Sequence, residues 1–252
     1  MLDLVYVSVG VNRSPHCIDW SGDDVIYAAG NAVVHADNDR GGRDSLECVD
    51  TLVAHTDRVN SVSFVSGGGE GCHFVSSSTD GTVVFWSAFA PSHTLKGHEG
   101  SVSVAVGTRV GDGGRSRVLV ASASSDSTIK LWTIPCDRRE EWVLDESVAV
   151  PKSGFANALR VRAMDGAALV FAATDDCGVH VYGKQLGGEK GTMRRLHSLR
   201  GHEDWVQCLD LTVDPAGGDL LLASGGQDSF IREEEMIWVV CVCFSQFMIV
   251  EF

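Results

Sequence analysis

The stretch SASSDSTIKLW, residues 122–132, decides the fold because variants of it recur along the chain. Close copies are SSSTDGTVVFW at 76–86 and AATDDCGVHVY at 172–182, and a weaker copy, LASGGQDSFIR, occupies 222–232. In the first three an aspartate stands six residues before a closing aromatic residue. Self-similarity at a period of about forty residues is typical of a repeat architecture.

Each copy has the pattern of two strands joined by a tight turn. Apolar and other residues alternate in TVVFW at 82–86 and in TIKLW at 128–132, which is strand periodicity. Asp-Gly at 80–81 and Asp-Ser at 126–127 are turn dipeptides. Long helical patterns are absent from the sequence, so we expect an all-β fold with four short strands per repeat.

A second signal lies upstream of the aromatic residues. The stretches AHTDRVNSVSF at 54–64, GHEGSVSVAV at 97–106 and GHEDWVQCLDL at 201–211 each place a histidine before an apolar strand. Together the two signals resemble the WD-repeat family, whose units form the blades of a β-propeller. In that family the histidine, a serine or threonine, the turn aspartate and the aromatic residue form a buried hydrogen-bonded tetrad.

The resemblance assigns tetrad positions in this sequence. Two repeats match fully, with His55, Ser78, Asp80 and Trp86 in one and His98, Ser124, Asp126 and Trp132 in the next. Two match in part, with Thr174, Asp176 and Tyr182 in the fourth repeat and His202, Asp228 and, at the serine position, Gly226 in the fifth. We expect residues 1–232 to form about five blades of a seven-bladed ring, with approximate boundaries 1–53, 54–96, 97–150, 151–200 and 201–232.

Serine, histidine and aspartate together also suggest a hydrolase that uses His98 or His202. We reject this interpretation because a nucleophile is needed once, in an accessible cleft, whereas the set recurs from repeat to repeat beside an aromatic residue. Glycine runs at 67–71 and 111–114 lack the lysine and hydroxyl residue of a phosphate-binding loop. The eight cysteines are scattered and lack zinc spacing. We therefore expect no catalytic set, no cofactor and no metal.

The composition limits the partners and the compartment. The chain has 252 residues and a formal charge of -14, which opposes nonspecific attraction to nucleic acid or to an anionic membrane. The first ten residues alternate like a strand and lack a basic leader, so they make a poor signal peptide. Unpaired thiols fit a cytoplasmic and nuclear protein.

Five stretches carry a narrower resemblance. They are GVNRSPHCIDWS at 10–21, VIYAAGNAVVHAD at 25–37, KSGFANALRV at 152–161, SLRGHEDWVQCLDL at 198–211 and LLLASGGQDSFIR at 220–232. They are similar to the second subunits of Elongator, the transfer-RNA modification complex, in the same order along the chain. The SGFANALRV segment departs from the general repeat but matches this family.

The resemblance implies a noncatalytic scaffold. Members have two seven-bladed propellers and assemble with a catalytic radical and acetyl-transfer subunit and a large platform subunit, in a complex that modifies wobble uridines. The alternative is a generic WD-repeat adaptor in ubiquitin ligation or chromatin binding. Such an adaptor would share the tetrads but has no reason to carry VNRSPHCIDW, residues 11–20.

Partner contacts are expected on loops and blade rims. Asn12, Arg13, His16 and Trp205 are candidates, with ordinary packing on the next strand as the alternative for Trp205. The segment 183–200 holds five Lys or Arg residues and one Glu, a net +4. We expect it to be the loop between the last two strands of the fourth blade. It is either a solvated loop or a local contact, through Arg194 and Arg195, with transfer RNA or an acidic partner.

The repeat pattern breaks after Arg232. Glu233, Glu234 and Glu235 stand where an apolar residue and a tryptophan are expected, and MIWVVCVCFSQFMIV at 236–250 follows. This run is short for a membrane span, which needs about 20 residues. We expect residues 233–252 to be foreign to the family, with two further blades and a second propeller missing. The alternative is that the strand resumes late, with Trp238 in the aromatic position.

Overall fold

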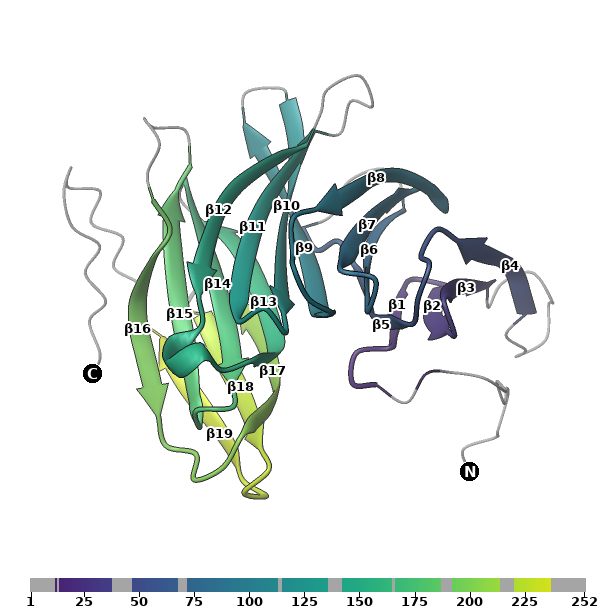
Figure 1. The fold of residues 1–252 in the computed structure, drawn as a ribbon. Helices are drawn as coiled ribbons and strands as arrows, with labels where there is room; N and C mark the ends of the chain where they lie inside the picture. Colours follow the sequence, from purple (N-terminus) through teal and green to yellow (C-terminus); the bar gives the residue numbers. More distant parts are fainter. Residues whose placement is uncertain are drawn as a thin grey trace. The chain divides into compact units, whose positions relative to one another are not determined.

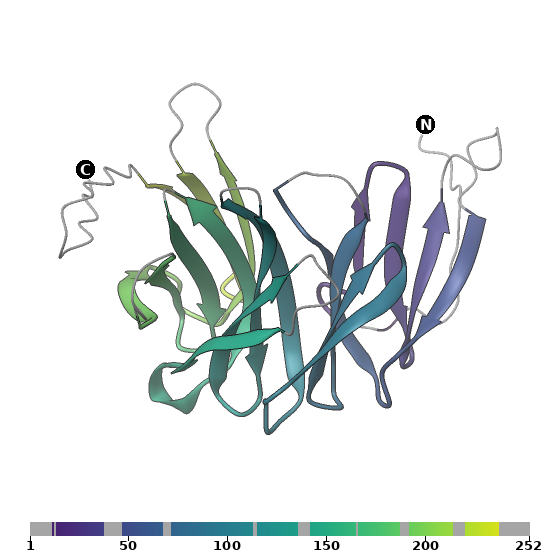
Figure 2. The same cartoon turned by 90° about the horizontal axis from the view of Figure 1, so that it is seen from above.

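The computed structural model describes residues 12, 14–37, 47–67, 72–112, 115–135, 142–164, 166–186, 192–213 and 220–236. These residues form five antiparallel sheets, each built from consecutive strands (Figures 1 and 2). This confirms the predicted class, an all-β fold of blade-type sheets that make up an incomplete β-propeller. The chain divides into two compact units, residues 1–147 and 148–252, and each is described by itself.

The first unit contains three sheets. The first sheet comprises β1 (Ile18–Ser21), β2 (Asp24–Ala29), β3 (Ala32–Asp37) and β4 (Glu47–Val53). The second comprises β5 (Val59–Phe64), β6 (His73–Ser78), β7 (Thr82–Ser87) and β8 (Ala90–Lys96). The third comprises β9 (Val102–Asp112), β10 (Arg115–Ser124), β11 (Thr128–Pro135) and β12 (Val143–Ala149), whose last two residues belong to the second unit.

The second unit contains two sheets after a short 3-10 turn, η1 (Pro151–Ser153). The fourth sheet comprises β13 (Ala156–Met164), β14 (Ala167–Thr174), β15 (Gly178–Gln185) and β16 (Arg194–Arg200). The fifth comprises β17 (Val206–Val213), β18 (Leu220–Gly226) and β19 (Ile231–Met236). No described helix has the length and apolar character that crossing a membrane requires.

Both faces of the second sheet are buried, which explains its continuous apolar pattern. On β7, Val84 and Trp86 pack with the first sheet, whereas Val83 and Phe85 pack with the third. Side chains two residues apart lie on one face of a strand, so the alternation along residues 82–86 serves two separate cores. The sheets are therefore held face to face by apolar packing, the main stabilising term of such a fold.

Asparagine side chains add polar ties between neighbouring sheets. Asn60 Nδ2 donates to the carbonyl oxygen of Val102 at 2.8 Å in the first unit. Asn157 Nδ2 donates to the carbonyl oxygen of Val206 at 3.0 Å in the second unit. Each bond joins the first strand of one sheet to the first strand of the next. It therefore fixes how far the two strands are shifted along each other.

The expectation that residues 183–200 form the connection between the last two strands of the fourth sheet was wrong in part. Arg194–Arg200 form the outer strand of the fourth sheet rather than a loop, because β16 pairs with β15 from Gly183 to Gly178. The fifth sheet continues past Arg232, since β19 pairs with β18 as far as Met236 opposite Leu220, while the expectation that residues 233–252 are foreign to the family stays a prediction. The backbone ladder therefore tolerates the three glutamates at 233–235, while Trp238 and the rest of the tail lie outside the described residues.

Candidate functional site: buried networks and exposed loops

The second sheet contains a buried chain of hydrogen bonds. His55 Nδ1 lies 3.1 Å from Asp80 Oδ2, and His55 Nε2 lies 2.8 Å from Ser76 Oγ. The indole Nε1 of Trp86 donates to the same Ser76 Oγ at 2.8 Å. Asp80 also accepts from the Thr82 hydroxyl at 2.6 Å. Strand, turn and preceding loop are thus joined through one histidine ring.

The bonding partners determine which atoms of this hydrogen-bond network carry a proton. Burial lowers the pKa of His55 below 6.5, despite the nearby Asp80, so the ring is neutral at pH 7. Burial of Asp80 opposes ionisation, but hydrogen bonds from Thr82 and from the Thr56 amide prevail and lower the pKa of the carboxyl group. A carboxylate only accepts, so His55 Nδ1 carries the proton and Nε2 accepts from Ser76. The serine oxygen in turn accepts from Trp86.

The third sheet repeats the network with its own residues. His98 Nδ1 lies 2.9 Å from Asp126 Oδ2, and His98 Nε2 lies 2.8 Å from Ser122 Oγ. Trp132 Nε1 donates to Ser122 Oγ at 2.8 Å. Hydrogen bonds from Thr128, the Glu99 amide and His98 outweigh the effect of burial and lower the pKa of Asp126 to about 2.

The assignment of Ser78 and Ser124 to the tetrads was wrong. Ser78 Oγ donates to the Asp57 carbonyl and accepts from the Asp80 amide at 3.1 Å, so it closes the turn instead. Ser124 accepts from the Asp126 amide in the same way. Serines two residues apart lie on the same face of a strand, and only the deeper one reaches both the histidine and the indole.

Signals for the correct residues were present in the sequence. A serine stands four residues before the aspartate in three repeats, as Ser76, Ser122 and Ser224. A threonine stands two residues after the aspartate in the second and third sheets, as Thr82 and Thr128. Both spacings recur, so a comparison of the copies at every position would have found them.

The fifth sheet keeps most of the network. His202 Nδ1 lies 2.9 Å from Asp228 Oδ2, and His202 Nε2 lies 2.9 Å from Ser224 Oγ. The serine is therefore present, and Gly226 does not occupy its position. The Gly226 backbone lies against the histidine ring, and a Cβ atom there would come within 2.4 Å of His202 Nδ1.

The fourth sheet has a different network around the same aspartate. His180, on β15, lies 3.0 Å from Asp176 Oδ1 through Nε2 and 2.8 Å from Ser198 Oγ through Nδ1. Arg200 donates to Asp176 Oδ2 at 2.8 Å, and Thr174 donates to Asp176 Oδ1 at 2.6 Å. Hydrogen bonds from Thr174, His180 and Arg200 outweigh burial and lower the pKa of Asp176 to about 2.

Tyr182 is not part of the fourth-sheet network. Its buried hydroxyl makes no hydrogen bond within the described parts of the chain. Ala172 stands four residues before Asp176, where the second, third and fifth sheets have a serine, so the aromatic residue lacks its acceptor. The histidine thus comes from β15 instead of the loop that precedes the sheet, because SGFANALRV supplies none there.

These networks cannot act as hydrolytic triads. Ser76 and Ser122 have no solvent-exposed surface, and each hydroxyl proton is directed at a histidine that is itself held by an aspartate. A substrate carbonyl has no path to either oxygen, whereas nucleophilic catalysis requires one. The histidine networks therefore stabilise the sheets.

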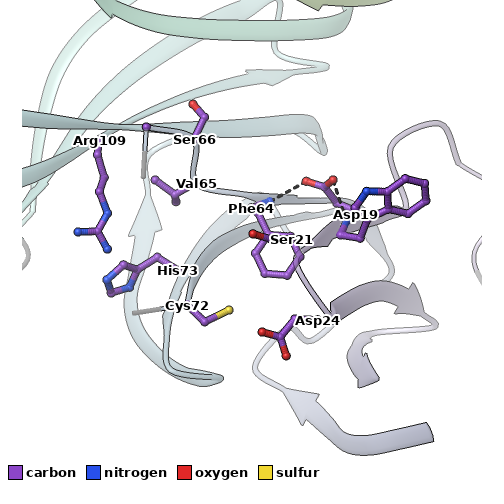
Figure 3. A pocket seen from close by; sticks show the side chains of 11 residues that line it. Asp19, Ser21, Asp24, Phe64, Val65, Ser66, Cys72, His73 and Arg109 are labelled. Atoms are coloured by element: carbon purple, nitrogen blue, oxygen red, sulfur yellow. Dashed lines mark hydrogen bonds between the residues drawn. The ribbon is translucent and has the colours of Figure 1, made fainter. Parts of the chain in front are cut away.

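A cavity of about 570 Å³ lies within the first unit, where β1, the end of β5 and β9 meet (Figure 3). Asp19 accepts from the Phe64 amide at 2.8 Å on one side, and Arg109 lies on the other. Cys72 and His73 line it too, but burial, aided by the charge of Asp24, raises the pKa of the Cys72 thiol to about 12. A thiol that stays protonated is a poor nucleophile.

The segment before β1 plays a structural part. Asn12 donates to the carbonyl oxygens of Gly30 and Val59 at 2.9 and 2.8 Å and accepts from the Gly30 amide. Its side-chain amide is thus used within the fold, and a partner contact by Asn12 stays a prediction. His16 is half-buried with a φ of 64°, and its carbonyl oxygen accepts from the Val62 amide. Arg13 lies outside the described residues.

The other candidate contacts are exposed. Trp205 retains 49% of its accessible surface, so packing on the next strand does not bury it. Arg194 and Arg195 are exposed at the start of β16. Among the residues that the structure describes, no group of three or more His, Cys, Asp or Glu side chains is placed to hold a metal ion.

The repeated sheets and networks agree with the comparisons with known proteins. The family described as WD domain, G-beta repeat, matches residues 46–87, 89–133 and 193–232. The matches cover half of the chain, which therefore belongs to the WD-repeat family.

Within this family the chain is a homologue of Elongator complex protein 2. It is 36% identical over 242 residues to the protein of that name from Drosophila melanogaster, covering 90% of this chain and 29% of the relative. It is 32% identical over 243 residues to that of Danio rerio, covering 92% and 27%. The Rattus norvegicus protein is 30% identical over 245 residues, covering 92% and 28%. The chain thus spans less than a third of the length of these relatives.

The two serines of the third sheet provide a test of the network. Ser122→Ala leaves the Trp132 indole without an acceptor and His98 without a donor, so we expect the free energy of unfolding to fall by about 2–4 kcal/mol. Ser124→Ala removes the acceptor of one turn amide, and we expect a loss of about 1 kcal/mol. Urea denaturation followed by circular dichroism measures both. Equal losses would show that Ser122 has no special role.

Proposed function

We propose that the chain is a noncatalytic scaffold subunit of an Elongator complex and supports the modification of transfer-RNA wobble uridines. The observation that carries this proposal is the similarity to proteins named Elongator complex protein 2 along nine-tenths of the chain. Its partners would be the platform and catalytic subunits, in the cytoplasm and nucleus.

The geometry supports a scaffold rather than an enzyme. The titratable sets that resemble catalytic groups are buried in the sheets, and the cavity beside Cys72 contains a protonated thiol. The exposed groups lie on loops and outer strands, where another protein can reach them.

A generic WD-repeat adaptor is the alternative. It would have the same networks in the second and third sheets. The rearranged fourth sheet favours Elongator, because SGFANALRV is the segment that removes the usual histidine and also the segment that resembles the Elongator subunit. Specificity for Elongator partners would then come from segments such as SGFANALRV, in which the sequence differs from the general repeat.

Affinity purification tests the scaffold proposal. We expect the tagged 252-residue chain, expressed in cells of its source, to recover the Elongator platform and catalytic subunits above an unrelated WD-repeat control. Mass spectrometry identifies the partners. Recovery of a ubiquitin ligase or a chromatin complex without Elongator subunits would favour the generic adaptor.

We further propose a local contact between β16 and transfer RNA. Arg194 and Arg195 are adjacent and exposed on the outer strand of the sheet, whereas Arg200 is held by Asp176. Lys190 and Glu189 lie outside the described residues. Successive side chains on a strand point to opposite faces, so the two guanidinium groups lie on either side of the outer strand, where each can contact a phosphate.

Charge reversal tests the contact with transfer RNA. We expect Arg194→Glu with Arg195→Glu to weaken binding in a filter assay and to reduce the slope of log K against log salt by about 1–2. Lys96→Glu with Arg117→Glu is the matched control, since both residues are exposed and the change in net charge is the same. Equal effects of the two double variants would leave only a general effect of net charge.

A further inference from the structure

Two exposed aromatic residues occupy equivalent positions in the fourth and fifth sheets. Phe155 immediately precedes β13 and Trp205 immediately precedes β17, and they retain 47% and 49% of their accessible surface. The Phe155 carbonyl accepts from the Asp175 amide at 3.2 Å, and the Trp205 carbonyl accepts from the Gln227 amide at 2.8 Å. In each sheet the same backbone bond joins this position to the turn between the second and third strands.

The first unit shows that the fold does not require an aromatic residue there. Arg58 precedes β5 and Ser101 precedes β9, and their carbonyls accept from the amides of Thr79 and Ser125, both at 2.9 Å. The position therefore needs only a carbonyl oxygen. Large apolar side chains that the fold does not require at such exposed positions are available for binding.

The two aromatic residues precede neighbouring first strands within the second unit. The bond from Asn157 Nδ2 to the Val206 carbonyl joins the starts of β13 and β17, two residues and one residue from Phe155 and Trp205 respectively. The loop before β17 is held in place, because His202 is bonded to Asp228 and the Glu203 amide donates to the same carboxylate at 3.0 Å. A preformed surface loses little entropy on binding.

The charges differ at the two ends of this surface. Asp204 accepts from the Trp205 amide at 2.8 Å, and the exposed Glu203 precedes it, so two carboxylates adjoin Trp205 along the chain. Near Phe155 the Asp175 carboxylate accepts from the Phe155 amide at 3.0 Å, and the exposed Lys152 in the preceding turn offsets its charge. A cation therefore fits at Trp205, where an aromatic face and carboxylates act together, and an apolar group fits at Phe155.

We propose that the surface of Phe155 and Trp205 binds an extended segment of another protein in which an arginine lies three residues from an apolar side chain. Packed sheets lie about 10 Å apart, and a chain in the polyproline II conformation rises about 3.1 Å per residue with three residues per turn, so side chains three residues apart lie on one side and span the two positions. The arginine stacks on the indole of Trp205 beside Asp204 and Glu203. The apolar side chain covers Phe155. This surface does not depend on the Elongator assignment, because it rests on the second unit alone.

A peptide titration tests this inference without any Elongator subunit. The probe is a fluorescein-labelled peptide with one leucine and one arginine three residues apart in a glycine and serine background. Citrulline replaces the arginine in the matched peptide. We expect the arginine peptide to bind the 252-residue chain in fluorescence anisotropy, and Trp205→Ser to weaken it about two- to fivefold. Phe155→Ser should weaken both peptides, and Trp20→Ser, a change at an exposed tryptophan of the first unit, should weaken neither.

Controls separate binding from folding. Trp205→Arg introduces the residue type that the second sheet carries at this position, so it should preserve the melting temperature and repel the arginine peptide. Equal binding of the arginine and citrulline peptides would overturn the proposal. So would unchanged binding by Trp205→Ser, or a change from dimer to monomer in that variant, which would assign the surface to a second copy of the chain.

Discussion

The structure depends on the aspartate at the turn between the second and third strands of a sheet. Asp80 and Asp126 each join three pieces of chain, because they accept from a histidine in the preceding loop, from the amide that follows it and from a threonine on the next strand. Their lowered pKa keeps them charged at neutral pH. A charged acceptor makes each of these bonds stronger than a neutral one would be. Without it, a buried histidine and a buried serine would lose their orientation together.

The sequence was informative about whatever recurs and uninformative about what occurs once. The aspartates, the histidines at 55, 98 and 202 and the strand pairs between them were predictable, because each appears in several copies at a fixed spacing. Ser76 and Ser122 were missed in favour of Ser78 and Ser124, since alternation cannot distinguish two serines on the same face of a strand. His180 and Arg200 could not be predicted, because their network exists in one sheet and its parts are joined only by the pairing of β15 with β16.

Because the hydrogen-bond network recurs in several sheets and stabilises them, other positions of each sheet can differ. The residue before the first strand contributes only its carbonyl oxygen in four of the sheets, so it is arginine in the second sheet, serine in the third and aromatic in the fourth and fifth. The outer strand likewise tolerates the exposed charges of β16. A repeat protein of this kind gains specific surfaces through residues that its folding does not constrain, which is consistent with a scaffold. In the fourth sheet even the loop histidine is absent. His180 on β15 takes its place, and Asp176 remains charged and hydrogen-bonded.

The protonation of the buried histidines tests the central claim most directly. Nitrogen-15 NMR of the 252-residue chain, labelled at the histidine rings, distinguishes the two neutral tautomers and the charged form. We expect His55 and His98 to be neutral at pH 7 with the proton on Nδ1, and to remain neutral below pH 6.5, where an exposed histidine becomes charged. A proton on Nε2, or titration of both rings near pH 6.5, would contradict the network of serine, histidine and aspartate on which this account rests.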